Sequence, residues 1–200
     1  MAKNIVKEIR SATRRKFTAE EKIRIVLEGF RRDTPIRDLC HSWGWYYLVT
    51  VMDDYSRFIL AWELKSDMAS NSLIDAVQKA VDATGMTDVP LEDRTTLLSD
   101  NGPGYISRQF GDYLRLVGIR HILASPYHPQ TNGKIERYHR TIKGALRLMP
   151  YEMPGALEET IRAFTDYYNY RRYHEGLDDV TPYDIYTGRY LKIIRRRKVT

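Results

Sequence analysis

The chain has 200 residues, of which 42% are hydrophobic and 29% charged, and it carries a net charge of +6. This length and composition predict one domain with a packed core, or one domain with a small appendage, and the basic charge favours a polyanionic partner. The single cysteine, Cys40, excludes an internal disulfide framework and favours a reducing cytosol. No apolar run approaches the ~18 residues of a membrane-spanning helix.

The first 42 residues predict a basic arm followed by two short helices. Residues 1–16 carry cations against a single acid, and they form either a solvated tail or an arm that contacts phosphates. Thr18 and Glu21 have the spacing of a capping box, which predicts the start of a helix. Pro35 opens a second short helix. Two roles remain open for this helical pair, namely packing on the rest of the protein and contact with DNA.

Strands and helices alternate through the middle of the chain, which is typical of an α/β fold. Runs of β-branched and aromatic residues predict strands, and apolar residues at helical spacing predict helices. The expected order is strand 45–52, polar turn 53–57, strand 58–64, helix 70–85, strand 94–99, helix 107–117 and strand 120–124. Asp53 and Asp54 lie in the polar turn, and we expect them to be turn and structural carboxylates.

The last third of the chain is predicted to be helical and basic. A loop at 125–133 precedes a helix that carries Glu136 in its first turn. Its expected buried stripe is Ile135, His139, Ile142, Leu146 and Met149. A final long helix is expected at 155–172, a short capped helix at 181–186, and a basic tail at 191–200. The stretch 167–174 interleaves aromatic rings with cations, which suits either packing or stacking on bases.

Two carboxylates, one after a predicted strand and one at the start of a predicted helix, suggest a metal site. Asp100 directly follows the strand 94–99, and Glu136 begins the helix after the loop, with 35 residues between them. A strand end and a helix start are rigid mounts for functional groups. Carboxylate oxygens are ligands that hard divalent cations prefer.

The motifs around these residues resemble the catalytic core of DDE transposases and retroviral-type integrases. The matching residues are Tyr46-Tyr47-Leu48 leading into Asp53-Asp54-Tyr55-Ser56-Arg57, then Ser99-Asp100-Asn101-Gly102, then the stretch from Ser125 to Gly133, and Glu136-Arg137. The closest likeness is to insertion-sequence transposases with a helix-turn-helix segment ahead of the core. The resemblance covers roughly residues 43–188 and, separately, 14–40.

The resemblance implies a ribonuclease-H-like α/β core, with a mixed sheet flanked by helices. It divides the chain into a basic arm with a partial helix-turn-helix at 1–42, the core at 43–190 and a basic tail at 191–200. It also implies strand transfer on DNA by two metal ions, Mg²⁺ or Mn²⁺. The expected partners are transposon ends, target DNA and further copies of the chain on DNA. The expected location is the cytoplasm of a bacterium, at the nucleoid.

Asp100 and Glu136 match the second and third carboxylates of the family, but nothing matches the first. Asp33 and Asp38 are weak candidates for it. The base-reading helix and the first, central strand are also missing, which indicates an internal deletion at Ser42–Trp43. The residues expected to bind DNA are Lys134, Arg137, Arg140, Lys143, Arg147, Arg171 and Arg172.

Three functions therefore stay open. The chain is a Mg²⁺-dependent transposase, a catalytically inactive remnant that binds DNA or associates with intact transposase, or a nuclease of the same fold. Loss of a central strand leaves backbone groups without partners, at a cost of ~1–3 kcal/mol each. We expect residues 31–42 to serve as a makeshift strand, which Pro35 opposes, or the two halves of the sheet to close up or stay apart. Because the central strand and the first carboxylate are missing, we expect marginal stability and no detectable strand transfer.

Overall fold

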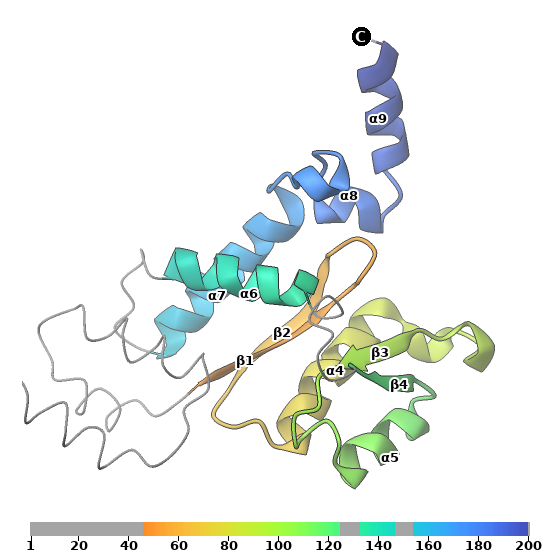
Figure 1. Ribbon diagram of the computed structural model, residues 1–200, viewed down its shortest axis with the longest axis vertical. Helices are drawn as coiled ribbons and strands as arrows, with labels where there is room; N and C mark the ends of the chain where they lie inside the picture. The colour runs from red at the N-terminus through yellow and green to blue at the C-terminus, as the bar shows by residue number, and fades with distance from the viewer. Residues whose placement is uncertain (1–45, 125–132, 147–153, 200) are drawn as a thin grey trace, which may run out of the picture. The chain divides into compact units, whose positions relative to one another are not determined.

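The computed structural model describes residues 46–124, 133–146 and 154–199, all of which belong to one compact unit, Tyr46–Thr200. The strands are β1 (Tyr47–Met52), β2 (Ile59–Lys65), β3 (Thr96–Ser99) and β4 (Arg120–Leu123) (Figure 1). The helices are α4 (Ser70–Thr84), α5 (Arg108–Leu116), α6 (Gly133–Leu146), α7 (Pro154–Tyr170), α8 (Pro182–Tyr186) and α9 (Tyr190–Val199). Short 3₁₀ turns lie at Met86–Asp88, Leu91–Asp93 and Glu175–Leu177. The predicted alternation of strands and helices is confirmed, and none of the described helices has the length and apolar character to cross a membrane.

The β1–β2 hairpin carries a bulge that turns one residue to the opposite face. The strands are antiparallel, with Val51 opposite Ala61 but Met52 opposite Ile59, so that Leu60 is an extra residue in β2. An extra residue shifts the alternation of side chains by one position. Ile59 therefore packs with the helices α6 and α7, whereas a regular strand would place it on the face of Ala61.

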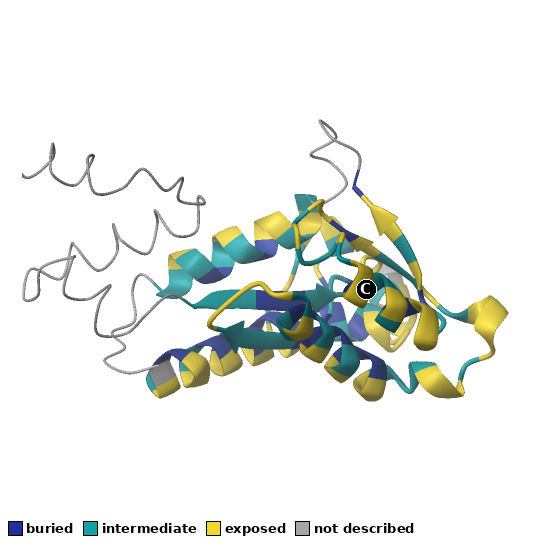
Figure 2. Ribbon diagram, turned by 90° about the horizontal axis from the view of Figure 1, so that it is seen from below, coloured by how far each residue is buried: buried dark blue, intermediate teal, exposed yellow. Residues whose placement is uncertain are grey.

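Each face of the hairpin belongs to a different hydrophobic cluster. Val49 is buried with residues of α4 and α5, and the positively charged Lys65 and Lys79 pair with Glu63 on the same side. The other face packs Leu48, Ile59 and Trp62 against α6 and α7. Figure 2 shows buried and exposed positions alternating along the helices, as amphipathic helices on a sheet require.

The strands among the described residues form two separate two-stranded sheets. β1 pairs only with β2, whereas β3 and β4 run parallel with Thr96 opposite Arg120. No ladder joins the two pairs within residues 46–124, but Val51 of β1 and Leu97 of β3 pack against the same cluster. Among the described residues, side-chain packing rather than backbone hydrogen bonding therefore connects β1 with β3. Residues 31–42, the possible makeshift strand, lie outside the described residues, so the expectation that they pair as a strand or that the halves of the sheet close up or stay apart remains a prediction.

The buried stripe of α6 differs from the predicted one. Tyr138 and Ile142 are its buried residues, while His139 is only half-buried, and Met149 lies outside the described residues. Among the described residues, Tyr138 is the largest side chain that is almost fully buried, and its hydroxyl group hydrogen-bonds Thr165 of α7 at 3.0 Å. The predicted stripe correctly included Ile142 but omitted Tyr138, which the core accepts because its hydroxyl group finds a polar partner there.

The C-terminal segment is held by polar contacts at its turns. Thr181 and Asp184 form a reciprocal capping box at the start of α8, which confirms the predicted capped helix. The predicted basic tail is helical from Tyr190 to Val199. The Arg197 guanidinium donates to the carbonyl oxygens of Asp178 and Asp179, each at 3.0 Å.

Candidate metal and nucleic-acid site

Asp100 lies in a tight turn at the end of β3. Its Oδ1 accepts a hydrogen bond from the backbone N–H of Gly102 at 2.8 Å, and the side chain is exposed. The Asn101 amide donates to the carbonyl oxygen of Ala124, which ties the turn to the end of β4. A Cβ at position 102 would lie 3.0 Å from Asp100 Oδ1, so glycine allows this close approach. The turn therefore fixes Asp100 as an exposed carboxylate at the end of β3.

A polar contact between β3 and β4 lies directly before this turn in the chain. Ser99 is buried, and its hydroxyl group lies 2.8 Å from Nε2 of His121 in β4. Burial of the His121 ring, which contacts Phe110 edge-on, lowers its pKa below the usual value. The lowered pKa favours the neutral form of the imidazole, which contacts Ser99, the residue before Asp100.

Glu136 lies in the first turn of α6, where its carboxylate is exposed. The structure shows that two polar contacts hold this part of α6 to the hairpin. Nζ of Lys134 reaches Asp54 in the β1–β2 turn, and Nε2 of His139 lies 3.2 Å from the hydroxyl group of Thr50 in β1. A negative side chain in the first turn also suits the positive end of the helix dipole.

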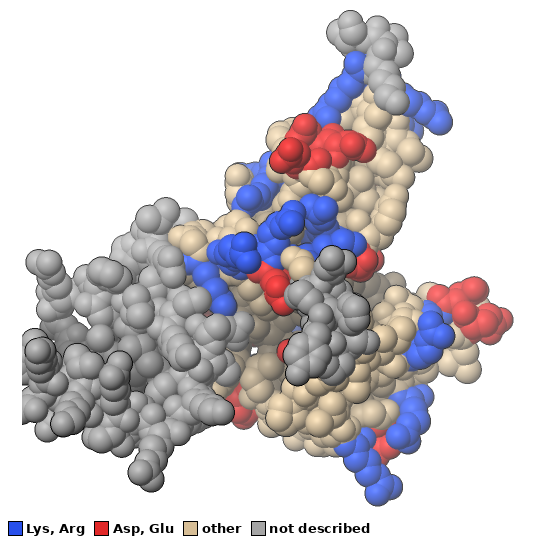
Figure 3. Space-filling model, viewed as in Figure 1, with Lys and Arg blue, Asp and Glu red and all other residues tan. Residues whose placement is uncertain are grey.

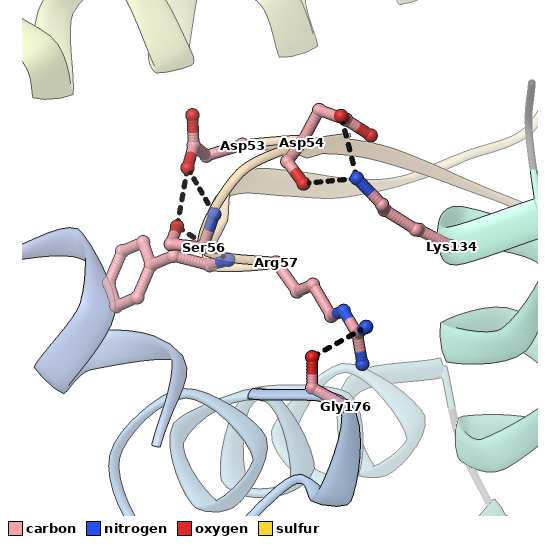
Figure 4. A network of polar contacts seen from close by, with 7 residues as sticks. Asp53, Asp54, Ser56, Arg57, Lys134 and Gly176 are labelled. Atoms are coloured by element: carbon pink, nitrogen blue, oxygen red, sulfur yellow. Dashed lines mark hydrogen bonds and ion pairs between the residues drawn. The ribbon is translucent and has the colours of Figure 1, made fainter. Parts of the chain in front are cut away.

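The β1–β2 turn has the structural carboxylates that the sequence predicts. Asp53 Oδ2 accepts hydrogen bonds from the backbone N–H of Ser56 at 2.8 Å and from its hydroxyl group at 2.5 Å (Figure 4). Asp54 instead binds Lys134 through its carboxylate and its carbonyl oxygen. Arg57, which has a left-handed φ of 62°, donates to the carbonyl oxygen of Gly176 at 3.1 Å. One turn therefore contacts both the start of α6 and the segment after α7.

The described residues offer two carboxylates rather than a complete metal centre. Within residues 46–124, 133–146 and 154–199, no group of three or more His, Cys, Asp or Glu side chains lies close enough to hold a metal ion. Asp33 and Asp38, the weak candidates for a further ligand, lie outside the described residues. The prediction that Asp100 and Glu136 share a metal stays a prediction.

Cations gather over α6, as Figure 3 shows. Arg137 and Arg140 are exposed, Lys143 is half-buried, and Arg147 lies outside the described residues. Lys134 is exposed but paired with Asp54 at 2.7 Å. Farther along the chain, Arg171 is exposed and Arg172 half-buried. The predicted DNA-binding residues of α6 therefore share one helix with Glu136.

The aromatic stretch 167–174 divides between core and surface. Tyr168 is buried, and its ring contacts His174 edge-on, while Tyr167 and Tyr173 are exposed. Buried Asn169 bonds both backbone groups of Ile59, which the sequence analysis missed. No local pattern could have revealed it, because the two residues are 110 positions apart.

The comparison with solved structures shows the fold. The catalytic core domain of BIV integrase matches with a TM-score of 0.54 and 20% identity, covering 76% of this chain and 92% of that one. The HTLV-2 integrase catalytic core domain in complex with magnesium (trimeric form) matches with a TM-score of 0.54 and 21% identity, covering 70% and 84%. The described residues thus have the ribonuclease-H-like α/β fold of integrase cores.

Sequence families and relatives lead to the same class. The integrase core domain family matches residues 34–129, and a second family with the same description matches residues 117–182. The Gag-Pro-Pol polyprotein of Squirrel monkey retrovirus is 34% identical over 100 residues, which is 50% of this chain and 5% of that protein. The Pol-related polyprotein of Mouse intracisternal a-particle MIA14 is 33% identical over 113 residues, 56% of this chain and 12% of that protein.

The two family models together match residues 34–182, and with the retroviral relatives they show that the chain carries a catalytic core of the integrase and DDE transposase type. It spans only a small part of the polyproteins that it matches.

Proposed function

We propose that this protein takes part in DNA transposition or integration by binding DNA along α6, with Asp100 and Glu136 as two ligands of an incomplete metal site. The observation that carries the proposal is the set of cations on α6, which surrounds the exposed Glu136 in an integrase-type fold. The net charge of +6 suits a polyanion. We propose the bacterial cytoplasm, at the nucleoid, as the place of action.

Two exposed carboxylates fit a hard divalent cation such as Mg²⁺ or Mn²⁺, which prefers oxygen ligands. Asp100 and Glu136 would each supply oxygen ligands to such a cation, and the chemistry it would supply is activation of a hydroxyl nucleophile and stabilisation of charge on a phosphodiester. A two-metal centre needs a further bridging ligand, and the described residues supply none. We therefore propose DNA binding without strand transfer by this chain alone, with association with an intact transposase as its route into the reaction.

DNA binding is expected to be salt-sensitive and largely independent of sequence, because phosphate contacts carry no base information. Fluorescence anisotropy with a labelled duplex, titrated over a range of salt concentrations, measures it. Arg137→Gln should reduce the slope of log affinity against log salt by about 0.9, the value of one phosphate contact. A strong preference for one duplex over scrambled competitors at physiological salt would contradict the proposal.

The alternative is active strand transfer. Incubation of the purified chain with a labelled DNA end and Mg²⁺ or Mn²⁺ should give no joined product. Robust product that disappears on Asp33→Ala or Asp38→Ala would establish the active enzyme and identify the third ligand. Nicked DNA without joining would instead indicate a nuclease.

A further inference from the structure

Lys134 forms two hydrogen bonds with Asp54 of the β1–β2 turn, whereas a lysine at an exposed helix start can remain solvated. Its Nζ donates to the carbonyl oxygen of Asp54 at 2.8 Å and to the carboxylate Oδ2 of the same residue at 2.7 Å (Figure 4). The two partners are 80 positions apart in the sequence. The contact joins α6 to the β1–β2 turn.

The position of Lys134 makes this contact significant for the helix. Lys134 is in the first turn of α6, where the helix dipole favours anions and disfavours cations. The carboxylate of Asp54 offsets that unfavourable charge. The carboxylate of Asp54 is not needed to close the turn, because Asp53 accepts the hydrogen bonds from Ser56 that do so.

Glu136 lies between two attachments of α6 to the hairpin. Lys134 binds the turn after β1, and His139 contacts Thr50 within β1 at 3.2 Å. Tyr138, one helical turn after Lys134, is fixed to Thr165 of α7. Contacts to the hairpin and to α7 together determine the rotation of α6 about its own axis, and hence the direction of an exposed side chain such as Glu136.

We propose that Asp54 is a positioning residue that holds Lys134, and through it the first turn of α6, so that Glu136 faces the DNA site in a fixed orientation. Lys134 is then part of this brace and not a phosphate contact. The importance of Glu136 rests on the proposed function, but the brace itself does not.

Hydrogen exchange tests the brace directly. The amides of Arg137 and Tyr138 are the first in α6 that can bond to carbonyl groups of the first turn. Asp54→Asn and Lys134→Gln should each accelerate their exchange by up to about fivefold, the factor that an exposed ion pair supports. The charge swap Asp54→Lys with Lys134→Asp should restore slow exchange, and the Lys134→Asp single variant controls for the helix dipole.

DNA titration tests the role of Lys134. Arg140→Gln is the matched control, since it removes one exposed cation from the same helix. Lys134→Gln should leave the salt slope unchanged, whereas Arg140→Gln should reduce it by about 0.9.

Unchanged exchange in both single variants, or a charge swap without rescue, would overturn the brace. A reduced slope for Lys134→Gln would overturn the claim that Lys134 avoids phosphates. If the wild-type chain binds no DNA, the proposed function fails, but the exchange data still decide on the brace.

Discussion

The side chain of Asn169 hydrogen-bonds both backbone groups of Ile59, the first residue of β2. Its Oδ1 accepts from the N–H of Ile59 at 2.9 Å, and its Nδ2 donates to the carbonyl oxygen of Ile59 at 3.0 Å, both in a buried environment. The amide thus replaces a neighbouring strand at one residue. A buried backbone group that loses its partner costs about 1–3 kcal/mol.

Asn169→Leu should lower the free energy of unfolding by about 2–4 kcal/mol, because both backbone groups of Ile59 lose their partners. Urea denaturation measures the change. Asp166→Asn on the exposed face of the same helix is the control and should shift it by less than about 0.5 kcal/mol. Equal effects of the two substitutions would contradict this reading of Asn169.

His174 should make the protein sensitive to acid. Burial, together with the nearby charges of Arg172 and Arg57, lowers its pKa to about 4. The unfolded chain therefore binds a proton at this residue between pH 6.5 and 4 while the folded chain does not, so stability falls as the pH falls through this window.

We expect His174 to account for about 1–2 kcal/mol of the stability that is lost at acidic pH, allowing for the part of the ring that solvent reaches. Urea denaturation of the wild type and of His174→Gln at several pH values isolates the contribution. A stability difference between the two proteins that does not change from pH 6.5 to 4 would contradict it.

At the scale of elements, the turn after β3 packs tightly on the start of α4. A Cβ at Gly104 would lie 2.6 Å from the carbonyl oxygen of Met68 and 2.6 Å from Cδ1 of Leu73. The backbone atom cannot move aside as a side-chain end can. Gly144 in α6, by contrast, has nothing within 4 Å of such a Cβ.

Alanine at these two glycines should therefore have opposite effects. Gly104→Ala should destabilise by about 1–3 kcal/mol through overpacking. Gly144→Ala should stabilise by about 0.5–1 kcal/mol, because alanine restricts the unfolded chain and favours a helix. Thermal denaturation measures the stability change of each variant, and changes of the same sign would refute the argument.

The elements were predictable because their signals are local. Apolar spacing predicted α4 and α5 to within two residues, and Ser107 and Gly85 lie at helix ends as expected. Asp53 is a turn carboxylate, as predicted, because its partner Ser56 is three positions away. The pairing of Lys134 with Asp54 was not predictable, since the same cation pattern on a helix also suits phosphate binding.

At the scale of the whole molecule, the described residues form two hydrophobic clusters, one on each face of the β1–β2 hairpin. β3 and β4 pair over four residues only, and Leu98, Ile122 and Leu123 are exposed. Short parallel pairs with an exposed face contribute little stability. The resemblance predicted the loss of a central strand, but sequence could not decide between makeshift pairing and separation. That outcome depends on packing between distant segments.

We expect stability near or below the lower end of the usual ~5–15 kcal/mol. Native-state hydrogen exchange should show the β3–β4 amides opening before those of β1–β2, because fewer buried contacts hold them. Exchange of both pairs in one global unfolding event would show instead that side-chain packing alone makes the two sheets cooperative.

The extra residue Leu60 limits how this hairpin tolerates change in length. Deletion of Leu60 itself would remove the bulge and leave Ile59 opposite Met52, on the face that meets Asn169, whereas deletion of one residue elsewhere in β2 would exchange the two faces on one side of the deletion. Away from the bulge, insertions and deletions of two residues preserve the facing of each side chain. Related sequences should therefore vary in the length of this strand by even numbers of residues or by loss of the bulge residue, and any other odd change should coincide with loss or relocation of the asparagine on α7.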